Sequence, residues 1–509
     1  MGIEEKEAEE FIETADQLAA VSGGLQSVLP DWGGPWWKVP HLRTLNLLLL
    51  VPLLSSTTGG YDGSMLNGLQ ALPQWGLYFG SPKGDVLGAL ASGVTFGWFV
   101  CFPVAPYLND RFGRRNSIAL GAVFMVIGSA LQAGSVSYAM FMVSRIVIGF
   151  GSFISSVAST LLLSELSYPT HRHIATAAYN TQFYMGALLA AYVTLGTFKW
   201  SSTSSWAWRI PSLLQGFFPL CQLLVVWWVP ESPRYLMQKD RYVEAKAVLL
   251  KHHGGGDETM GANLVAFEMA EIEESLRNDQ SNTSSYMDFL ANSSNRRRLF
   301  IVIWLGAVTQ LSGNALTSYY LVLVLESIGI TSPGHQLVIN AGLMTYCLGI
   351  SLAAACLVEV LGRRTLMLNG TIGMFFAFII WTVLSGINQA RDFLDASLGQ
   401  GVLAMIFIFY LCYNVGLNGV PILYATEVLP NTLRAKGMNI LFLTICLTQI
   451  FNGFVNPVAM DAIEWKYYIV YCCVIAVEIP VVYFFFPETK GRTLEEAVAM
   501  FDNEPKQVD

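Results

Sequence analysis

The chain has few charged residues for its length. Asp, Glu, Lys and Arg make up 13% of the 509 residues, whereas apolar residues make up 53%. Soluble domains average about 25% charged residues. The mean hydropathy is +0.47, and apolar runs recur along the chain that are about 20 residues long, enough to cross a bilayer as a helix. These features exclude a soluble globular fold and indicate an integral membrane protein embedded in the lipid bilayer.

Several function classes lack their signatures. The sequence contains no GxxxxGK[ST] loop, so ATP-driven transport has no support. The six histidines lie outside the apolar runs or at their ends, and we find no nucleophile, metal-ligand set or cofactor loop. We therefore expect no enzyme activity, no metal site and no bound cofactor. The net charge of −8 is spread over the tails and the central loop, which argues against nucleic acid as a partner.

The cysteines and the N-terminal residues give little further information about structure or localisation. The eight cysteines all lie within apolar runs, where Cys behaves as a small hydrophobic side chain, so we expect no disulfide bonds. The first 20 residues are acidic and lack a short apolar core behind a positive end, so we expect no cleaved secretory signal.

Twelve apolar segments occur in two groups of six. The polar stretch between the groups has amphipathic and Gly-rich parts, which indicate short helices joined by loops. We predict an all-α membrane protein with a tail (1–41), a six-helix bundle (42–229), a helical linker (230–298), a second six-helix bundle (299–486) and a tail (487–509). The predicted spans are 42–66, 86–108, 117–133, 138–163, 174–197 and 208–229, then 299–322, 336–360, 365–384, 400–425, 434–455 and 466–486.

Lys and Arg indicate the orientation. Loops that stay in the cytosol hold the excess of these residues. Placing both tails and the linker in the cytosol assigns 24 of the 29 Lys and Arg residues to that side. We predict both termini in the cytosol, with the plasma membrane as the default location. No motif addresses assembly, and we expect a monomer.

The two halves repeat three motifs in register. NDRFGRR (109–115) follows the second span, and VEVLGRR (358–364) follows the eighth. In the same way LSELSYPTHR (163–172) matches YATEVLPNTLR (424–434), and PESPRYL at the end of the first half matches PETKGRTLEE at the end of the second. Two related bundles of this kind form transporters whose site lies between them near the middle of the membrane.

Asp62 and Arg145 are charged residues inside predicted spans. An isolated charge at the membrane centre costs about 2.5–3.5 kcal/mol on insertion scales, so such residues indicate function. Because an unpaired guanidinium would be equally costly, we predict that Arg145 of the fourth span pairs with Asp62 of the first. The glycines around Asp62, in SSTTGGYDGSMLNG, allow another helix to approach closely.

Amide and tyrosine side chains recur in four spans. Amides donate and accept hydrogen bonds at once, and a ring face covers the C–H groups of a pyranose, so this set suits a sugar. In the seventh span, the spacing of Gln310, Asn314 and Thr317 predicts one shared helical face. The alternative is that such amides bond between helices as packing contacts. The candidate substrate-binding residues are Asn180, Gln310, Asn314, Tyr319, Asn414, Asn418 and Asn452.

These motifs resemble the sugar porter family of the major facilitator superfamily (MFS). GYDGSMLNG is similar to the family's first-span GYDxGxxxG, VSRIVIGFG to GRxxxG, and TQLSGNALTSYY to QQLSGINxxxYY; PESPR and PETKG are typical of sugar porters. Within the family, YNTQFYMG, SGNA and FVNPVA most resemble fungal lactose and cellodextrin permeases. The resemblance implies the MFS fold with twelve transmembrane helices and a disaccharide or hexose substrate.

The resemblance also implies a coupling mechanism. In the resembled proton symporters the first-span Asp takes up the proton and the fourth-span Arg is its partner. Asp62 and Arg145 would therefore couple proton entry to sugar entry, with the proton as the coupling ion and no cofactor.

A third implication concerns the charged motifs on the cytosolic side. In the family these side chains cross-link the two halves while the carrier faces outward and separate when it opens inward. The matching residues are Asp110, Arg111, Arg114, Arg115, Glu165, Arg172, Glu231, Arg234, Glu359, Arg363, Arg364, Glu427, Arg434 and Glu488.

Departures from the family pattern leave alternatives open. Asn180 stands where hexose carriers have Gln, and Ile422 stands where many have Trp. The chain could therefore be a uniporter with a static ion pair, or a carrier of another metabolite, including an exporter of a secondary product. A nutrient sensor is disfavoured by the short tail after Lys490.

Overall fold

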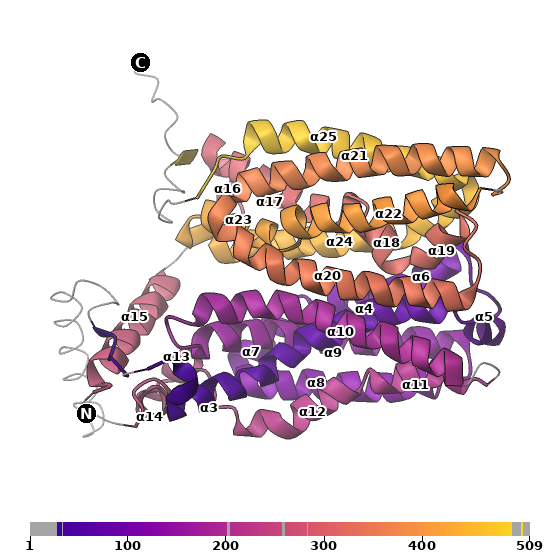
Figure 1. Cartoon of the computed structure of the whole chain (residues 1–509). Coiled ribbons are helices and arrows are strands. Elements are labelled where there is room, and N and C mark those ends of the chain that lie inside the picture. The colour runs from indigo at the N-terminus through magenta and orange to yellow at the C-terminus, as the bar shows by residue number, and fades with distance from the viewer. Residues whose placement is uncertain are drawn as a thin grey trace, which may run out of the picture.

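The structure is a computed structural model that describes residues 28–32, 34–200, 204–256, 260–281, 284–393, 395–490 and 500–501. Helices form all of its regular elements in these ranges. They are arranged in two layers of long, roughly parallel helices, with the first half of the chain in one layer and the second half in the other (Figure 1). The predicted all-α architecture of two bundles is confirmed.

The first bundle contains the six predicted spans, and the structure divides three of them. Its helices are α3 (Pro40–Leu48) with α4 (Leu50–Gln70), α6 (Gly84–Cys101) with α7 (Val104–Phe112), α8 (Arg114–Ala133), α9 (Tyr138–Leu166), α10 (Arg172–Trp200), and α11 (Trp206–Leu214) with α12 (Phe217–Val225) and η2 (Val226–Trp228). A short helix, α5 (Pro73–Phe79), follows the first span.

The second bundle repeats this order. Its helices are α17 (Ser293–Leu311) with α18 (Asn314–Tyr319) and α19 (Leu321–Glu326), α20 (Pro333–Leu361), α21 (Arg363–Ala390), α22 (Ala396–Tyr413) with the π-helical turn η3 (Asn414–Asn418) and α23 (Val420–Val428), α24 (Asn431–Ile463), and α25 (Tyr467–Phe485) after η4 (Glu464–Lys466). All twelve spans therefore appear in the predicted order. The seventh begins earlier than predicted, because the basic stretch before residue 299 is already helical.

The linker helices lie at one end of the molecule (Figure 1). They are α13 (Pro233–Gln238), α14 (Tyr242–His252), α15 (Ala262–Ser281) and α16 (Asp288–Ala291). A small apolar core of its own holds α13 to α15 together, including Leu236, Leu249 and Met269. We call this end of the molecule the linker end, and the other the far end.

Three spans are less apolar than the rest. Within the described residues, eight stretches are long and apolar enough to cross a membrane. They include neither α4, nor α10, nor the divided span α17 to α19. These are the spans that carry Asp62, Asn180 and Gln310. In α4 and α10 polar side chains lower the hydropathy, as expected for helices that line a site between the bundles. In the seventh span the basic residues at the start of α17 and the break after it have this effect.

Small residues bring α4 and α10 into direct backbone contact. A Cβ added to Gly60 would collide with the backbone of Phe183, and one added to Gly186 would collide with the carbonyl oxygen of Thr57. Close approach of this kind is the usual role of glycine between membrane helices. The predicted close packing at Gly60 is therefore present.

The seventh span is interrupted next to its polar residues. Helix α17 ends at Leu311, and Gly313 has a φ of +98°, so α18 starts in a new direction. Gln310 and Asn314 therefore do not lie on one continuous helix, and the predicted shared face with Thr317 is wrong. The spacing rule fails because it assumes an unbroken helix, and the glycine breaks it.

Candidate functional site

The structure brings Asp62 of α4 and Arg145 of α9 together inside the first bundle. Arg145 Nη1 lies 3.3 Å from Asp62 Oδ1, and Nη2 lies 3.4 Å from Oδ2, so the two groups face each other as a fork. Arg145 is fully buried. Gly93 makes room for it, since a Cβ at that position would lie 2.9 Å from the Cβ of Arg145.

Gln215 is a third member of this group that the sequence did not predict. Its Nε2 donates a 2.8 Å hydrogen bond to Asp62 Oδ1. The residue is fully buried and caps α11, just before Gly216 and the start of α12. The break in the sixth span therefore places an amide against the carboxylate. An amide followed by glycine within an apolar run was the signal that could have identified it.

The break in the seventh span is held by side chains from neighbouring helices. A helix end leaves its last carbonyl groups without partners. Here Tyr413 donates to the carbonyl oxygen of Thr309 at 3.1 Å, and Asn452 donates to that of Gln310 at 2.7 Å. Asn452 is predicted to bind substrate, but here its amide group donates a hydrogen bond to the backbone instead. The Gln310 side chain is half-buried and has no hydrogen bond among the described residues.

Several other predicted ligands lie around this break. Ser318 donates to Asn314 Oδ1 at 3.0 Å and meets the Tyr410 hydroxyl at 3.1 Å. Tyr319 accepts a 2.6 Å hydrogen bond from Gln449 of α24. Helices α18, α22 and α24 therefore present their polar groups at one place.

The remaining predicted ligands lie on α10 and around η3. Asn414 is buried and donates to the Tyr410 carbonyl oxygen at 2.8 Å, while its Oδ1 accepts from Asn418 at 3.1 Å. Tyr184 of α10 is buried near Asn414, so the two bundles approach each other at this level. Asn180 lies one turn closer to the linker end than Tyr184 and is exposed.

The bundles are fastened to each other toward the far end. Asn67 of α4 donates to the Ser318 carbonyl oxygen, and its Oδ1 accepts a 3.1 Å hydrogen bond from the backbone of Leu321. Gln70 donates to the Tyr319 carbonyl oxygen at 2.8 Å. Two amides of the first bundle therefore satisfy the backbone where α18 gives way to α19, and they close this side of the interface.

The charged motifs of the linker end form two matching clusters, one in each bundle. In the first, Arg114 contacts Glu165 through Nε at 3.0 Å and Nη2 at 3.1 Å, and Ser232 donates to the same carboxylate at 2.5 Å. Glu231 accepts from the backbone of Arg114 at 3.0 Å and of Arg115 at 3.2 Å.

The second cluster has the same design. Arg363 contacts Glu427 at 3.0 Å, and Thr489 donates to that carboxylate at 2.6 Å. Glu488 accepts from the backbone of Arg363 at 3.0 Å. Burial alone would raise the pKa of Glu488, but backbone hydrogen bonds from Lys490, Thr365 and the arginines outweigh it and lower the pKa below the usual value. Each of these contacts stays within one bundle.

The other predicted gate residues are more dispersed. Arg115 lies over the Trp227 ring, and Arg234 pairs with Asp279 of α15 at 2.6 Å. Arg364 and Arg434 donate to backbone oxygens of Tyr483 and Leu429. Three residues, Asp110, Arg111 and Arg172, are exposed, and the side chain of Glu359 lies outside the described residues.

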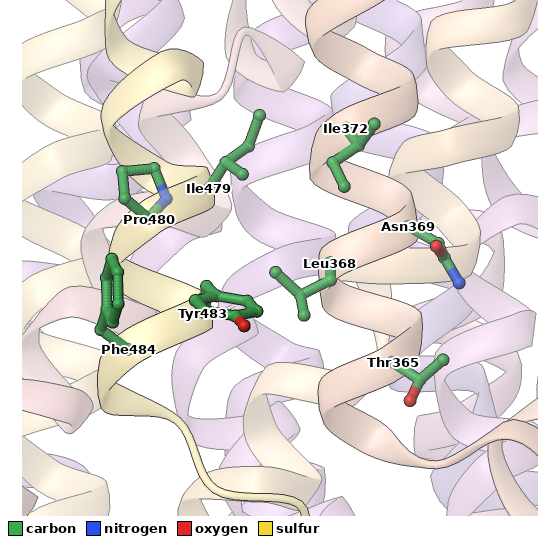
Figure 2. A pocket seen from close by; sticks show the side chains of 8 residues that line it. All are labelled: Thr365, Leu368, Asn369, Ile372, Ile479, Pro480, Tyr483 and Phe484. Atoms are coloured by element: carbon green, nitrogen blue, oxygen red, sulfur yellow. The ribbon is translucent and has the colours of Figure 1, made fainter.

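A surface groove lies away from all these residues. It has a volume of about 450 Å³ and runs between α21 and α25, with Leu368 and Tyr483 pointing toward each other across it (Figure 2). Its lining is mostly apolar. Because it opens on the outer face of one bundle rather than between the two, we do not assign the transported solute to it.

Comparison with known proteins agrees with this architecture. Residues 48–501 match the family described as "Sugar (and other) transporter". The chain is 31% identical to the MFS-type transporter oryC of Aspergillus oryzae, over 84% of this chain and 79% of that protein. It is 26% identical to a high-affinity glucose transporter of Kluyveromyces lactis, over 92% and 87% of the two chains.

Solved structures show the same fold. The proton:xylose symporter XylE bound to a bromodeoxyglucose superimposes with a TM-score of 0.71 at 23% identity, over 90% of this chain and 99% of that one. Its inward-open form from E. coli gives a TM-score of 0.72 at 22% identity, with the same coverage. The MFS fold with twelve spans is thereby confirmed. The family match covers nearly the whole of both bundles, and this chain belongs to the Sugar (and other) transporter family, whose members are multi-pass membrane carriers of small molecules rather than enzymes.

Proposed function

We propose that this protein is a proton-coupled sugar carrier that moves a hexose or a disaccharide by alternating access of its two bundles. The observation that carries the proposal is the buried group of Asp62, Arg145 and Gln215. A carboxylate held between a fixed cation and a neutral donor can take up and release a proton without unfolding the surrounding helices. In this proposal the proton is the coupling ion, and the carrier uses no bound cofactor.

Protonation of Asp62 would change the energy of the bundle arrangement. The neutral acid no longer attracts Arg145, and the guanidinium is left buried without a counter-charge. A state that relieves this cost becomes favoured, so proton binding shifts the population between conformations. If substrate binds one of those conformations better, proton and substrate movements are coupled.

The polar groups around the break of the seventh span are the best candidates for binding the sugar. The Gln310 amide has no hydrogen bond among the described residues, and Asn314, Tyr319, Asn414 and Asn418 lie on neighbouring turns. Such groups suit the dense hydroxyls of a sugar. The names of two similar proteins support this solute class, since one is called a glucose transporter and the other a proton:xylose symporter.

We further propose that the linker end faces the cytosol, in the plasma membrane. The amides of Asn67 and Gln70 close the far end, and each charged cluster lies within one half of the chain, which supports an inward-facing arrangement. In the outward-facing state the charged clusters would meet across the interface.

A carrier of another metabolite is the second candidate. The family description includes other solutes, and the relative from Aspergillus oryzae is named only as an MFS-type transporter. Export of a secondary product and simple uniport both belong to this alternative.

Proteoliposomes separate these options. We expect radiolabelled hexoses, disaccharides or polyols to exchange across the membrane, and one of the sugars to accumulate under an inward proton gradient. Asp62→Asn should abolish accumulation and leave exchange intact, whereas Asp85→Asn, which removes an exposed carboxylate, should change neither. Unchanged accumulation in Asp62→Asn would remove this residue from coupling.

A further inference from the structure

Glu478 is a second carboxyl group buried inside the membrane-spanning region. It lies in α25, seven residues before the helix ends at Phe485, and only 1% of it is exposed. The ion pairs of the described residues do not include it. Its hydrogen-bond partner is the hydroxyl of Ser312, which lies 3.0 Å from Oε1 and 3.1 Å from Oε2.

The hydrogen bonds of Ser312 indicate the charge state of Glu478. A serine hydroxyl has one proton to donate. The nearest acceptor of the Ser312 hydroxyl is the carbonyl oxygen of Val308, four residues earlier in α17. A serine at a helix end commonly makes this bond. Ser312 therefore shares its single proton between this carbonyl oxygen and Glu478, so it gives the carboxyl group less than one full donor, which favours the protonated form.

Solvation gives the same result. An ionised carboxylate in a nonaqueous interior needs a cation or several donors, and without them it takes up a proton instead. Glu478 has one neutral hydroxyl partner among the described residues. Asp62, by contrast, has a guanidinium and an amide around it. The two buried acids of this chain are therefore in opposite environments.

The helices packed against α25 bring few charges near Glu478. They are α17, α21, α24 and η4. The cations Arg364 of α21 and Arg297 of α17 lie at the linker end, where they donate to the carbonyl oxygens of Tyr483 and Phe485. Glu464 and Lys466 of η4 lie at the opposite end of α25. Among the described residues, Tyr413 of α22 is a titratable side chain close enough to Glu478 to interact with it electrostatically.

Ser312 connects this carboxyl group to the break of the seventh span. It is the C-cap of α17 and precedes Gly313, where the chain turns. A Cβ at Gly313 would lie 2.5 Å from Phe378, whose ring stacks on Tyr471 of α25 with centroids 5.4 Å apart. The break is thus packed against α25, the helix that carries Glu478. A negative charge on Glu478 would disturb the packing of both the break and α25.

We propose that Glu478 is a second proton-binding site of this carrier, occupied in the conformation seen here and linked through Ser312 to the bend of the seventh span. Ionisation would leave a buried negative charge that has no ion-pair partner among the described residues. The packed arrangement becomes less favourable, and the population moves toward conformations in which water reaches this side of α25. The site does not depend on the coupling role of Asp62.

Infrared difference spectroscopy tests the charge state directly. We expect purified wild-type protein in lipid at neutral pH to show the carbonyl stretch of a protonated carboxyl group that is missing in Glu478→Gln. The exposed-residue control Glu271→Gln and the Asp62→Asn variant should keep this band. Ser312→Ala should shift it to the frequency of a carboxyl group without a hydrogen bond. If Glu478→Gln shows the same protonated-carboxyl bands as the wild type, Glu478 is ionised in the wild type and the proposal is wrong.

A conformational readout tests the link to the seventh span. Spin labels at the exposed positions Tyr107 and Leu361 report the separation of the two bundles at the linker end. We expect their distance distribution to change with rising pH in the wild type and in Asp62→Asn, but to stay constant in Glu478→Gln. Should Glu478→Gln fail to fold, Ser312→Ala serves instead, with a reduced pH response. An equal response in all variants would refute the link, whatever the outcome for proton-coupled transport.

Discussion

Gln215 and Arg145 share one oxygen of Asp62. The amide lies 2.8 Å from Oδ1, and the guanidinium lies 3.3 Å from the same atom. The shorter contact thus belongs to the neutral partner, which comes from the broken sixth span. The buried group is therefore built from α4, α9 and the junction of α11 with α12, and the proposed coupling would depend on all of them.

Gln215→Leu should weaken coupling more than transport itself. Loss of a hydrogen bond to a charged group costs about 1.5–3 kcal/mol, which corresponds to roughly tenfold or more in an equilibrium. We expect gradient-driven accumulation to fall about tenfold while exchange persists. Gln222→Leu is the matched control, because that buried amide binds Ser55 and the Val51 carbonyl oxygen instead. Equal accumulation in Gln215→Leu and the wild type would make the contact incidental.

Gln310 and Asn452 should respond differently to truncation. The Gln310 amide has no hydrogen bond in the described part of the chain, whereas the Asn452 amide donates to a backbone oxygen. Loss of one hydrogen bond costs about 0.5–1.5 kcal/mol, so Gln310→Ala should raise the half-saturating concentration several-fold at unchanged thermal stability. Asn452→Ala should mainly lower the melting temperature. Transport kinetics and melting curves on the same preparations measure both effects. An unchanged half-saturating concentration in Gln310→Ala would show that this residue does not bind the solute.

The two glycines of the charged clusters should be equally intolerant of a side chain. Gly113 and Gly362 have φ values of +88° and +89°, and a Cβ at either would meet the carboxylate of Glu231 or Glu488. Backbone conformations of this type cost about 1–3 kcal/mol for a residue other than glycine. Gly113→Ala and Gly362→Ala should each lower stability in a melting experiment, unlike Gly349→Ala, where a Cβ meets open space. Unchanged melting temperatures of Gly113→Ala and Gly362→Ala would contradict the matching role of these glycines in the two charged clusters.

The docking of the linker should weaken in acid. Burial, with Lys251, His253 and His41 nearby, lowers the pKa of His252 to about 4 from 6.5. The docked linker therefore keeps this ring neutral, while the undocked linker takes up a proton as the pH falls through 6.5. Stability is lost between pH 6.5 and about 4.

Hydrogen exchange of the α14 and α15 amides measures this effect. We expect the opening of these helices to become easier across that pH interval in the wild type, and the change to be smaller in His252→Gln. His335→Gln, an exposed far-end control, should behave like the wild type. A His252→Gln profile identical to that of the wild type would show that another group controls the docking.

The fold could be predicted from the sequence because the membrane imposes simple rules. Hydropathy separated twelve spans, and the motif pairs around Gly113 and Gly362 revealed the repeat. Interruptions inside spans were less visible. The break at Gly313 depends on a positive φ, and the sequence contains many glycines that remain helical, such as Gly60.

The site could be predicted only in part, because burial and partners depend on the packing of distant helices. Asp62 and Arg145 were recognisable as charges in apolar runs. Gln215 and Asn452 differ from other span amides only in what they face. Glu478 stands close to the polar end of its helix, so the sequence did not separate it from interfacial residues.

Proton movement on addition of substrate tests the central claim most directly. Proteoliposomes in weakly buffered medium, without an imposed gradient, are given the sugar that supports exchange, and the external pH is followed. The account predicts that the medium becomes alkaline with the wild-type protein and does not change with Asp62→Asn, although the sugar crosses the membrane in both. Sugar entry through the wild-type protein without any proton uptake would contradict it.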